Sequence, residues 1–289
     1  MSNVTYNSKL YSILRIILPV AMRRFIDRVI ARLERGKALI RLSNLRRRMF
    51  ANPPRTSGIE RFMSYTVRIT DGPNFFMQYK DEFVRRIYHF ESARPNPLIL
   101  DCGSNIGISI LYFKHVYPQA RIIGFEPDPV IFGILQENVS GNKLDSVTLI
   151  NAALSAQSGT AAFSPDGSAG GHITDRNNLT VRVEQLSAYL NEPVDFLKLN
   201  IEGEELPVLL ESASSGKLRN VREMVIEYHG WADGQQRLGA ILELLDQQGF
   251  RYMIHDFDHE TSSMTKPPFR FLKNKPWFCL VYACRVEDL

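Results

Sequence analysis

The chain has 289 residues, of which 44% are hydrophobic and 23% charged, and its formal net charge is +4. This length and composition can bury one large α/β core plus an extension, and they exclude a low-complexity or disordered chain. The three cysteines are an odd number without metal-ligand spacing, and the chain does not open with a secretory signal peptide. We therefore expect no metal site and a reducing, cytoplasmic location.

The first 50 residues differ chemically from the rest. They hold twelve of the 35 Lys and Arg residues but two of the 31 Asp and Glu residues, which leaves 23 basic against 29 acidic residues in the remainder. Apolar and arginine residues recur at helical spacing from residue 10 to residue 50, interrupted by Pro19 and Gly36, which predicts two or three short amphipathic helices. The uncharged run between Arg15 and Arg23 has seven residues. A transmembrane helix needs about 20, so this segment is not predicted to span a bilayer.

Two interpretations of this basic helical extension, residues 1–57, stay open. Residues 10–50 could lie on an anionic membrane surface as a peripheral contact. Alternatively, the helices form a cap whose apolar face packs on the main domain or on a second subunit of a homo-oligomer. We favour the cap because amphipathic helices usually serve a core. No nucleic-acid recognition motif accompanies the charge, so no nucleic-acid partner is expected.

A hairpin and a helix are predicted in residues 58–97, before the main domain at 98–289. Polar and apolar residues alternate over 64–70, which predicts a first strand. The Asp-Gly-Pro-Asn sequence at 71–74 favours a turn, and a second strand is predicted at 75–79. A helix over 81–90 follows. This segment would form a lid beside the main sheet.

From residue 98 onward, short apolar strands alternate with helical segments, which predicts a mostly parallel sheet with helices on both faces. The predicted strands are 98–100, 121–125, 147–153, 194–200, 223–227, 251–255 and 278–283. The predicted helices are 108–116, 130–138, 206–212 and 236–248. An extra short hairpin is expected from 161–164 and 179–183. The fold class is therefore α/β, with a doubly wound, seven-stranded, Rossmann-like sheet.

The stretch from 98 to 107, Leu-Ile-Leu-Asp-Cys-Gly-Ser-Asn-Ile-Gly, organises this predicted domain. Three apolar residues indicate a buried strand, and Gly103, Ser104 and Gly107 let the backbone bend tightly into a helix. A ligand lying across such a turn meets unpaired backbone N–H groups. In a pyrophosphate-binding loop this position is left free for anions, whereas here Asp101 stands at the tip of the strand. A ligand with a positive centre is therefore favoured.

Polar side chains also end the neighbouring strands. Glu126 follows the second strand, 25 residues after Asp101, where an acid in doubly wound folds hydrogen-bonds the ribose of a nucleoside. The alternative for Glu126 is an acid that caps the next helix. The polar residues at alternating positions on the fourth and fifth strands are Lys198, Asn200, Glu202, Glu227 and His229. Because the carboxyl ends of central strands converge on one crevice, these side chains could face a substrate beside the nucleoside.

Four segments together resemble the FkbM-type S-adenosylmethionine-dependent methyltransferases. They are Asp-Cys-Gly-Ser-Asn-Ile-Gly (101–107), Phe-Glu-Pro-Asp-Pro (125–129), Lys-Leu-Asn-Ile-Glu-Gly (198–203) and Ile-Glu-Tyr-His (226–229). Four motifs in the right order are a specific signal. The resemblance spans about residues 75–285, and it implies the methyltransferase fold and O-methylation of a hydroxyl on a sugar, a glycan or a secondary metabolite.

The resemblance also implies a binding site for S-adenosylmethionine. The expected cofactor-binding residues are Asp101, Gly103, Ser104, Asn105, Gly107, Glu126, Pro127 and Asn200. Asp101 and the turn would hold the methionine part with its sulfonium, and Glu126 the ribose. One position departs from the family pattern, because Asn200 replaces the usual Asp. The loss of this carboxylate weakens any argument for a divalent metal.

An acceptor hydroxyl must lose its proton during transfer, and His229 is the general-base candidate because its unperturbed pKa is about 6.5. Glu202 or Glu227 would orient the imidazole. The alternative is a histidine at a strand end that hydrogen-bonds to the backbone. Lys198 could orient an acidic group of the substrate or pair with Glu202.

Two other classes of function share parts of this pattern. A nicotinamide-dependent oxidoreductase would also need a glycine turn and an acid, but this turn is not Gly-x-Gly-x-x-Gly and no Tyr-x-x-x-Lys pair is present. A binding or scaffold protein at a membrane surface that kept the fold but lost the transfer is the stronger alternative. Asn200 would then mark the lost chemistry.

Overall fold

The computed structural model of the chain describes residues 36, 39–165, 171–173, 179–231, 234–255 and 276–285. The chain divides into two compact units, Met1–Asn52 and Pro53–Leu289. In the first unit, residues 39–49 form a helix. The predicted helices before residue 36 lie outside the described residues, so membrane contact and oligomerisation stay predictions. None of the described helices combines the length and the hydropathy that crossing a bilayer requires.

The second unit begins with an antiparallel hairpin, β1 (Gly58–Phe62) and β2 (Tyr65–Ile69). A hairpin therefore precedes the core, but the strand predicted at 75–79 is wrong, because this segment belongs to helix α3 (Gly72–Tyr79). The Asp71 side chain accepts a hydrogen bond from the Asn74 N–H, so the Asp-Gly-Pro-Asn sequence starts a helix rather than a turn. The helix predicted over 81–90 is instead the π-helical turn η1 (Lys80–Arg85).

Seven strands form the central sheet. They are β3 (Leu98–Cys102), β4 (Arg121–Phe125), β5 (Val147–Ile150), β10 (Val194–Leu199), β11 (Val221–Trp231), β12 (Phe250–His255) and β13 (Pro276–Arg285). Their spatial order is β12-β13-β11-β10-β3-β4-β5, with β13 antiparallel to both neighbours and the other pairs parallel. The predicted doubly wound, mostly parallel sheet is confirmed. Its strand order reverses between β3 and β10, where such sheets open a ligand crevice.

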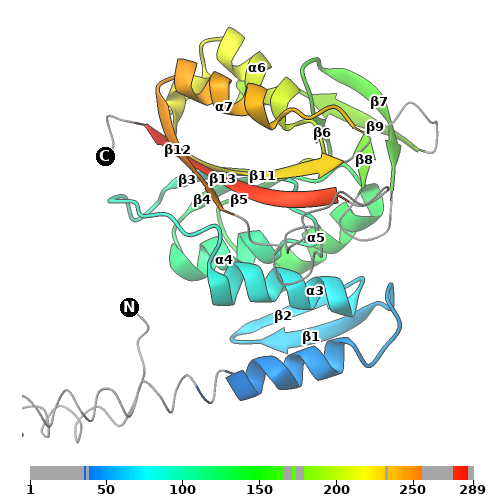
Figure 1. Cartoon of the computed structure of the whole chain (residues 1–289). Coiled ribbons are helices and arrows are strands. Elements are labelled where there is room, and N and C mark those ends of the chain that lie inside the picture. The colour runs from blue at the N-terminus through cyan, green and yellow to red at the C-terminus, as the bar shows by residue number, and fades with distance from the viewer. Residues whose placement is uncertain are drawn as a thin grey trace, which may run out of the picture. The chain divides into compact units, whose positions relative to one another are not determined.

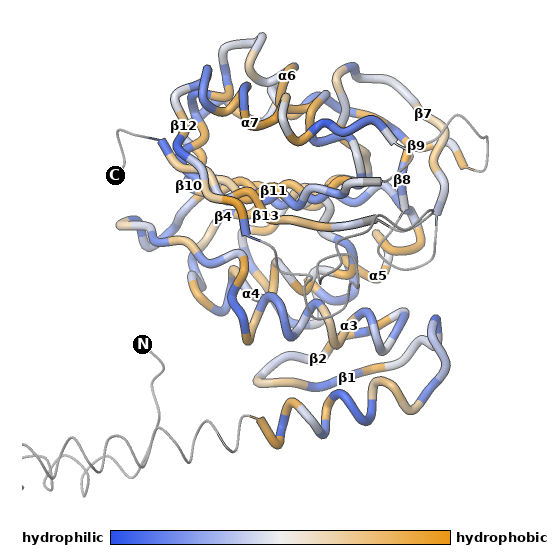
Figure 2. The backbone as a smooth tube through the Cα atoms, viewed as in Figure 1, coloured by the Kyte–Doolittle hydropathy of each residue, from blue (hydrophilic) through white to orange (hydrophobic). Residues whose placement is uncertain are grey.

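Helices cover both faces of this sheet (Figure 1). α4 (Ile108–Val116) and α5 (Pro129–Gly141) lie on one face, and α6 (Glu205–Ser214) and α7 (Leu238–Gln247) on the other. The central strands run largely in hydrophobic colours while the helices alternate (Figure 2), as expected for strands buried on both faces.

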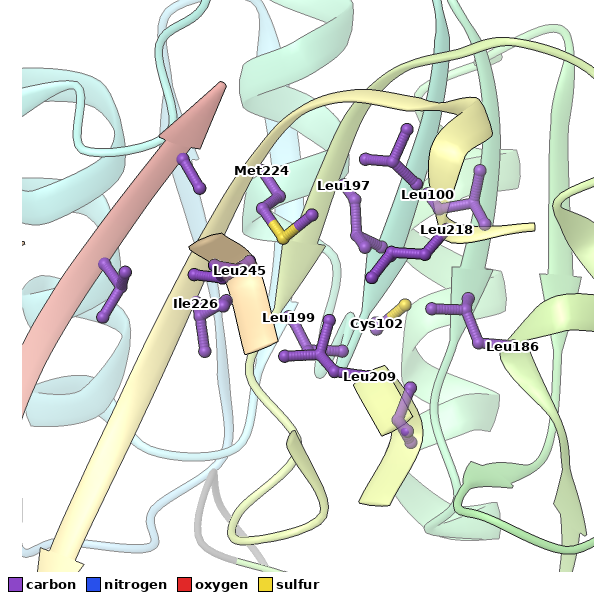
Figure 3. Packing of buried hydrophobic residues seen from close by; sticks show 14 of the residues in the cluster. Leu100, Cys102, Leu186, Leu197, Leu199, Leu209, Leu218, Met224, Ile226 and Leu245 are labelled. Atoms are coloured by element: carbon purple, nitrogen blue, oxygen red, sulfur yellow. The ribbon is translucent and has the colours of Figure 1, made fainter. Parts of the chain in front are cut away.

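The two faces of the sheet bury different residues. Leu100, Cys102 and Leu197 pack with Leu209 and Leu245 on the α6 and α7 side (Figure 3). The intervening residues of the same strands point to the α4 and α5 side, where Ile99 and Phe196 pack. By the same alternation Asp101 and Lys198 also point to this second side.

A smaller sheet stands beside the main one, in the order β6-β9-β7-β8. It contains β6 (Ala153–Leu154), β7 (Gly159–Ser164), β8 (His172–Ile173) and β9 (Leu179–Glu184). The pairing of β7 with β9 is antiparallel, as predicted for 161–164 and 179–183. Ala153, predicted as the end of the third core strand, instead starts β6.

Asn138 of α5 attaches the hairpin to the core. Its amide oxygen accepts from the Arg68 N–H at 2.7 Å, and its amide nitrogen donates to the carbonyl oxygens of Arg68 at 3.0 Å and Ile106 at 2.8 Å. One buried side chain therefore holds both β2 and the glycine turn. Asn142, one turn later, makes the same pair of bonds to Thr66 in an exposed position.

We expect Asn138→Ala to lower the free energy of unfolding by about 2–4 kcal/mol, because it leaves one buried and two partly buried backbone groups without partners. Asn142→Ala is the matched control and should cost less than about 1 kcal/mol, since water can replace its bonds. Urea unfolding followed by circular dichroism measures both values. Equal costs for the two variants would contradict the role given to Asn138.

Candidate active site

A cavity of about 890 Å³ lies at the carboxyl ends of β3, β4 and β10 and along β11, with α3 and η1 bordering it. The five polar residues that the sequence placed on the fourth and fifth strands all line it: Lys198, Asn200, Glu202, Glu227 and His229. Gly103, Ser104, Asn105, Glu126 and Pro127 line it as well. Asp101 and Gly107, also predicted to bind the cofactor, lie outside this lining.

The glycine turn after β3 is shaped by close backbone packing. Gly103 has a φ of +88°, and a Cβ added there would lie 1.9 Å from the carbonyl oxygen of Asn200. Gly107 has a φ of +92°, and its Cβ would meet the Leu135 side chain at 2.7 Å. The N–H groups of Gly103 and Ser104 both donate to the Phe125 carbonyl oxygen. The turn is therefore held between the ends of β4 and β10, and side chains are kept out of it.

Glu126 stands beside this turn at the tip of β4. One carboxylate oxygen accepts from the Asn105 N–H at 3.0 Å and the other from the Asp128 N–H at 2.8 Å. Burial raises the pKa of Glu126 to about 7, although both backbone N–H groups favour the charged form. Each carboxylate oxygen still has a lone pair with which to accept a further hydrogen bond. Asp128 caps α5, which is the role considered as the alternative for Glu126.

Asp101 is fully buried beneath the cavity and forms an ion pair with Lys198. β3 and β10 are in register with these two residues as neighbours, so Asp101 Oδ1 lies 3.0 Å from Lys198 Nζ. Asp101 Oδ2 accepts from the Ser109 hydroxyl at 2.6 Å. Asp101 therefore positions Lys198, and because Asp101 lies outside the cavity lining, its contact with the cofactor stays a prediction. Lys198 takes Asp101 as its partner where the sequence suggested Glu202.

Lys198 remains a cation in this environment. Burial alone would lower the pKa of Lys198, but the charges of Asp101, Glu82 and Glu227 raise it above its usual value. Its ammonium group also donates to the Gly103 carbonyl oxygen, which ties β10 to the glycine turn.

His229 lies in the lining of the cavity, and a backbone carbonyl oxygen fixes the orientation of its ring. Nδ1 lies 3.1 Å from the carbonyl oxygen of Glu227, which can only accept, so Nδ1 carries the proton of the neutral ring. Nε2 lies 3.4 Å from Glu202 Oε1. Burial lowers the pKa of His229 below its usual value. The Glu227 carboxylate accepts from Tyr88 at 3.0 Å instead of orienting His229, so of the two predicted carboxylates only Glu202 faces the ring.

Glu202 stands in a strained turn that a second acid supports. Its φ is +54°, in the left-handed region that side chains rarely adopt. The buried Glu205 accepts from the N–H groups of Ile201 at 3.1 Å and Gly203 at 3.0 Å. Sequence analysis missed Glu205, although an acid in the first turn of a helix after a glycine could have indicated such a role.

Three further cavity residues that sequence analysis missed come from the segment bordering the strands: Gln78 on α3, Glu82 on η1, and Tyr88. Gln78 donates to the Asn105 side chain at 3.2 Å, so α3 contacts the glycine turn directly. Three buried acceptor atoms of the lining have no hydrogen-bond partner among the described residues: Gln78 Oε1, Glu82 Oε2 and Asn200 Oδ1. Within those residues, no three His, Cys, Asp or Glu side chains are grouped as a metal site would require.

The fold and the cavity together define a doubly wound protein with a nucleoside-type site at its strand switch point. Residues 101–252 match the methyltransferase FkbM domain family, and the chain belongs to this family. Family membership also supports the S-adenosylmethionine cofactor expected from the sequence.

Several relatives of the chain are named as methyltransferases. Methyltransferase sdnD of Sordaria araneosa is 29% identical over 205 residues, covering 57% of this chain and 79% of that protein. The 2-O-methyltransferase NoeI of Sinorhizobium fredii is 28% identical over 179 residues, covering 53% and 72%. The 31-O-demethyl-FK506 methyltransferase FkbM of Streptomyces tacrolimicus is 24% identical over 213 residues, covering 60% and 80%. The solved methyltransferase FkbM of Methylobacillus flagellatus has a TM-score of 0.47 at 16% identity, covering 71% of this chain and 47% of that one.

Proposed function

We propose that this protein is an S-adenosylmethionine-dependent O-methyltransferase that acts on a hydroxyl of a sugar, a glycan or a secondary metabolite. The observation that carries the proposal is the buried Glu126 carboxylate at the tip of β4, beside the glycine turn and inside the cavity. The two relatives whose names specify a position both methylate oxygen, which supports this acceptor atom.

The residues of the cavity fit the cofactor. The turn packs against the Asn200 backbone through Gly103, and Gly103, Ser104 and Asn105 of the turn line the cavity where the cofactor would lie. Glu126 would accept from the ribose hydroxyls. The buried side-chain oxygens of Gln78 and Asn200 accept no hydrogen bond among the described residues. The ammonium group of the methionine part has three N–H donors and could supply these bonds. S-adenosylmethionine, when bound, supplies the methyl group and its electrophilic sulfonium.

The residues above β10 and β11 would prepare the acceptor. His229 is neutral because its pKa is lowered, and Nε2 is then free of a proton and able to take one from the acceptor hydroxyl. Glu202, at 3.4 Å, would stabilise the imidazolium that forms. Lys198 keeps its charge and joins β10 to the glycine turn. It would therefore help to align the cofactor at the turn with the acceptor above β10.

Calorimetric titration with S-adenosylmethionine tests this function. We expect saturable one-to-one binding that Glu126→Ala weakens at least about tenfold, because a charge-assisted pair of hydrogen bonds is lost. Glu137→Ala, which removes an exposed acid of α5, is the matched control and should leave binding unchanged. Absence of binding by the folded wild type would refute the proposal. Binding without methyl transfer to any hydroxylated acceptor would instead favour the scaffold alternative.

The affinity for S-adenosylmethionine should depend on pH through Glu126. Its pKa of about 7 means that the carboxyl group is mostly charged at pH 8 and mostly protonated at pH 6. Ribose hydroxyls donate more strongly to the charged form, so we expect the affinity to fall about tenfold from pH 8 to pH 6. Titrations at half-unit steps of pH measure this profile. Glu126→Gln should bind more weakly at pH 8 and show a flat profile, and an equally steep profile in this variant would assign the effect to another group.

A further inference from the structure

Two carboxyl groups above β10 and β11 have no role in the proposed methyl transfer, Glu82 and Glu227. Both line the cavity. Glu227 lies on β11 two residues before His229, and its charge is one of those that raise the pKa of Glu82. The inference drawn from them concerns the acceptor of the transfer, and it therefore rests on the proposed function.

Glu82 is held in place by an unusual piece of backbone. It lies on η1, a π-helical turn that directly continues α3 and ends at Arg86 in the left-handed conformation. The ion pair between Asp81 and Arg85, at 2.9 Å, stabilises this turn. Isolated π-helical turns are rare and occur frequently at functional sites.

One oxygen of the Glu82 carboxyl group is buried in the lining of the cavity without a hydrogen bond from the described residues. The residue is 6% exposed, and its Oε2 atom has no partner among the described residues. Leaving a buried acceptor unsatisfied is costly, more so when it is charged. Burial raises the pKa of Glu82 well above its usual value, and a ligand that brings a donor and a positive charge would reverse this effect.

The charges around Glu82 do not balance. In the described lining, Lys198 is the only lysine or arginine side chain, and it is paired with Asp101 at 3.0 Å. Glu227 accepts a hydrogen bond from Tyr88 but faces no second cation of the lining, and burial raises its pKa as well. Glu82 and Glu227 therefore have no cation of their own in the described lining, and a buried carboxylate is costly unless a positive charge compensates it.

We propose that Glu82, together with Glu227, binds a protonated amine of the acceptor next to the hydroxyl that is methylated, as in an amino sugar or another amino alcohol. An ammonium group has three donors and a positive charge, so it supplies both the hydrogen bond that Glu82 lacks and the missing counter-charge. A neutral hydroxyl supplies only the hydrogen bond, and a carboxylate supplies neither. The acceptor half of the cavity therefore selects cationic over neutral and neutral over anionic molecules.

The selectivity can be measured with three ring compounds of sugar size that differ in one substituent. They are trans-2-aminocyclohexanol, trans-1,2-cyclohexanediol and trans-2-hydroxycyclohexanecarboxylate, titrated into the full chain at pH 7 with saturating S-adenosylhomocysteine and followed by NMR. We expect the amino alcohol to bind at least about tenfold more tightly than the diol, and the acid not to bind. In Glu82→Gln, the affinities for the amino alcohol and the diol should lie within about twofold of each other. Glu192→Gln, which removes an exposed acid outside the lining, should keep the full preference.

Separate titrations with S-adenosylmethionine distinguish the ways in which the inference can fail. We expect Glu82→Gln to bind the cofactor as tightly as the wild type. Weaker cofactor binding with an unchanged preference among the ring compounds would show that Glu82 holds the cofactor's own amine and would overturn the inference, as would equal binding of the three compounds by the wild type. Loss of cofactor binding in the wild type would refute the proposed function itself. Glu227→Gln should reduce the same preference, and it carries the test if Glu82→Gln does not fold.

Discussion

Lys198→Met is expected to lower the free energy of unfolding by about 3–5 kcal/mol, because removing one partner of a buried ion pair leaves the other charge uncompensated. Asp101 is fully buried, and Lys198 is the only lysine or arginine in the described lining of the cavity. Without the Lys198 ammonium group, the three acids Asp101, Glu82 and Glu227 would share a poorly solvated region whose described lining contains no lysine or arginine. The hydrogen bond to the Gly103 carbonyl oxygen would be lost as well. Urea unfolding at pH 7, followed by circular dichroism, measures the loss.

A double variant distinguishes the loss of the whole ion pair from the loss of one of its two charges. Asp101→Asn combined with Lys198→Met removes both charges of the ion pair, so it should be more stable than Lys198→Met alone. Lys217→Met is the matched control, because Lys217 hydrogen-bonds to Ser187 and Asn191 at the surface and should cost less than about 1 kcal/mol. A double variant less stable than Lys198→Met would show that the uncompensated charge is not the source of the loss.

The central sheet could be predicted from the sequence because its signals are local. Strands such as Leu98–Cys102 and Val194–Leu199 are short apolar runs between turn signals, and alternation fixes which of their residues share a face. The convergence of Glu126, Lys198 and His229 on one cavity follows from the same rules, since the carboxyl ends of parallel strands meet.

The pairing of Asp101 with Lys198 could not be predicted, because it depends on the register between two strands that are far apart in sequence. A shift of one residue would point these side chains to opposite faces. The same limit applies to Glu82, whose place in the cavity depends on how α3 and η1 pack against the sheet. The strand predicted at 75–79 is wrong for a different reason. Their aromatic composition favours a strand, but the Asp71 cap and Pro73 start a helix.

The second large effect is expected at the glycine turn, where Gly103→Ala should lower the free energy of unfolding by about 3 kcal/mol or more. Two costs combine at this position. The φ of +88° is unfavourable for alanine, and the new Cβ would lie 1.9 Å from the Asn200 carbonyl oxygen, a backbone atom that cannot rotate away. Relief of this clash requires β3 and β10 to separate, which also displaces Lys198 and the turn. Any folded Gly103→Ala protein should therefore bind S-adenosylmethionine more weakly.

Two other glycines make the costs separable. Gly216 has a φ of +71° with no atom within 4 Å of a Cβ, so Gly216→Ala should show the backbone strain alone, about 1–2 kcal/mol. Gly133, inside α5, also has open space and no left-handed φ, so Gly133→Ala should stabilise the protein by up to about 1 kcal/mol. Urea unfolding of the three variants should rank them Gly133, Gly216 and Gly103 from most to least stable. If Gly103→Ala lowered the free energy of unfolding no more than Gly216→Ala, the clash with the Asn200 backbone would have been relieved without loss of stability. The contact between the turn and Asn200 would then not constrain the site.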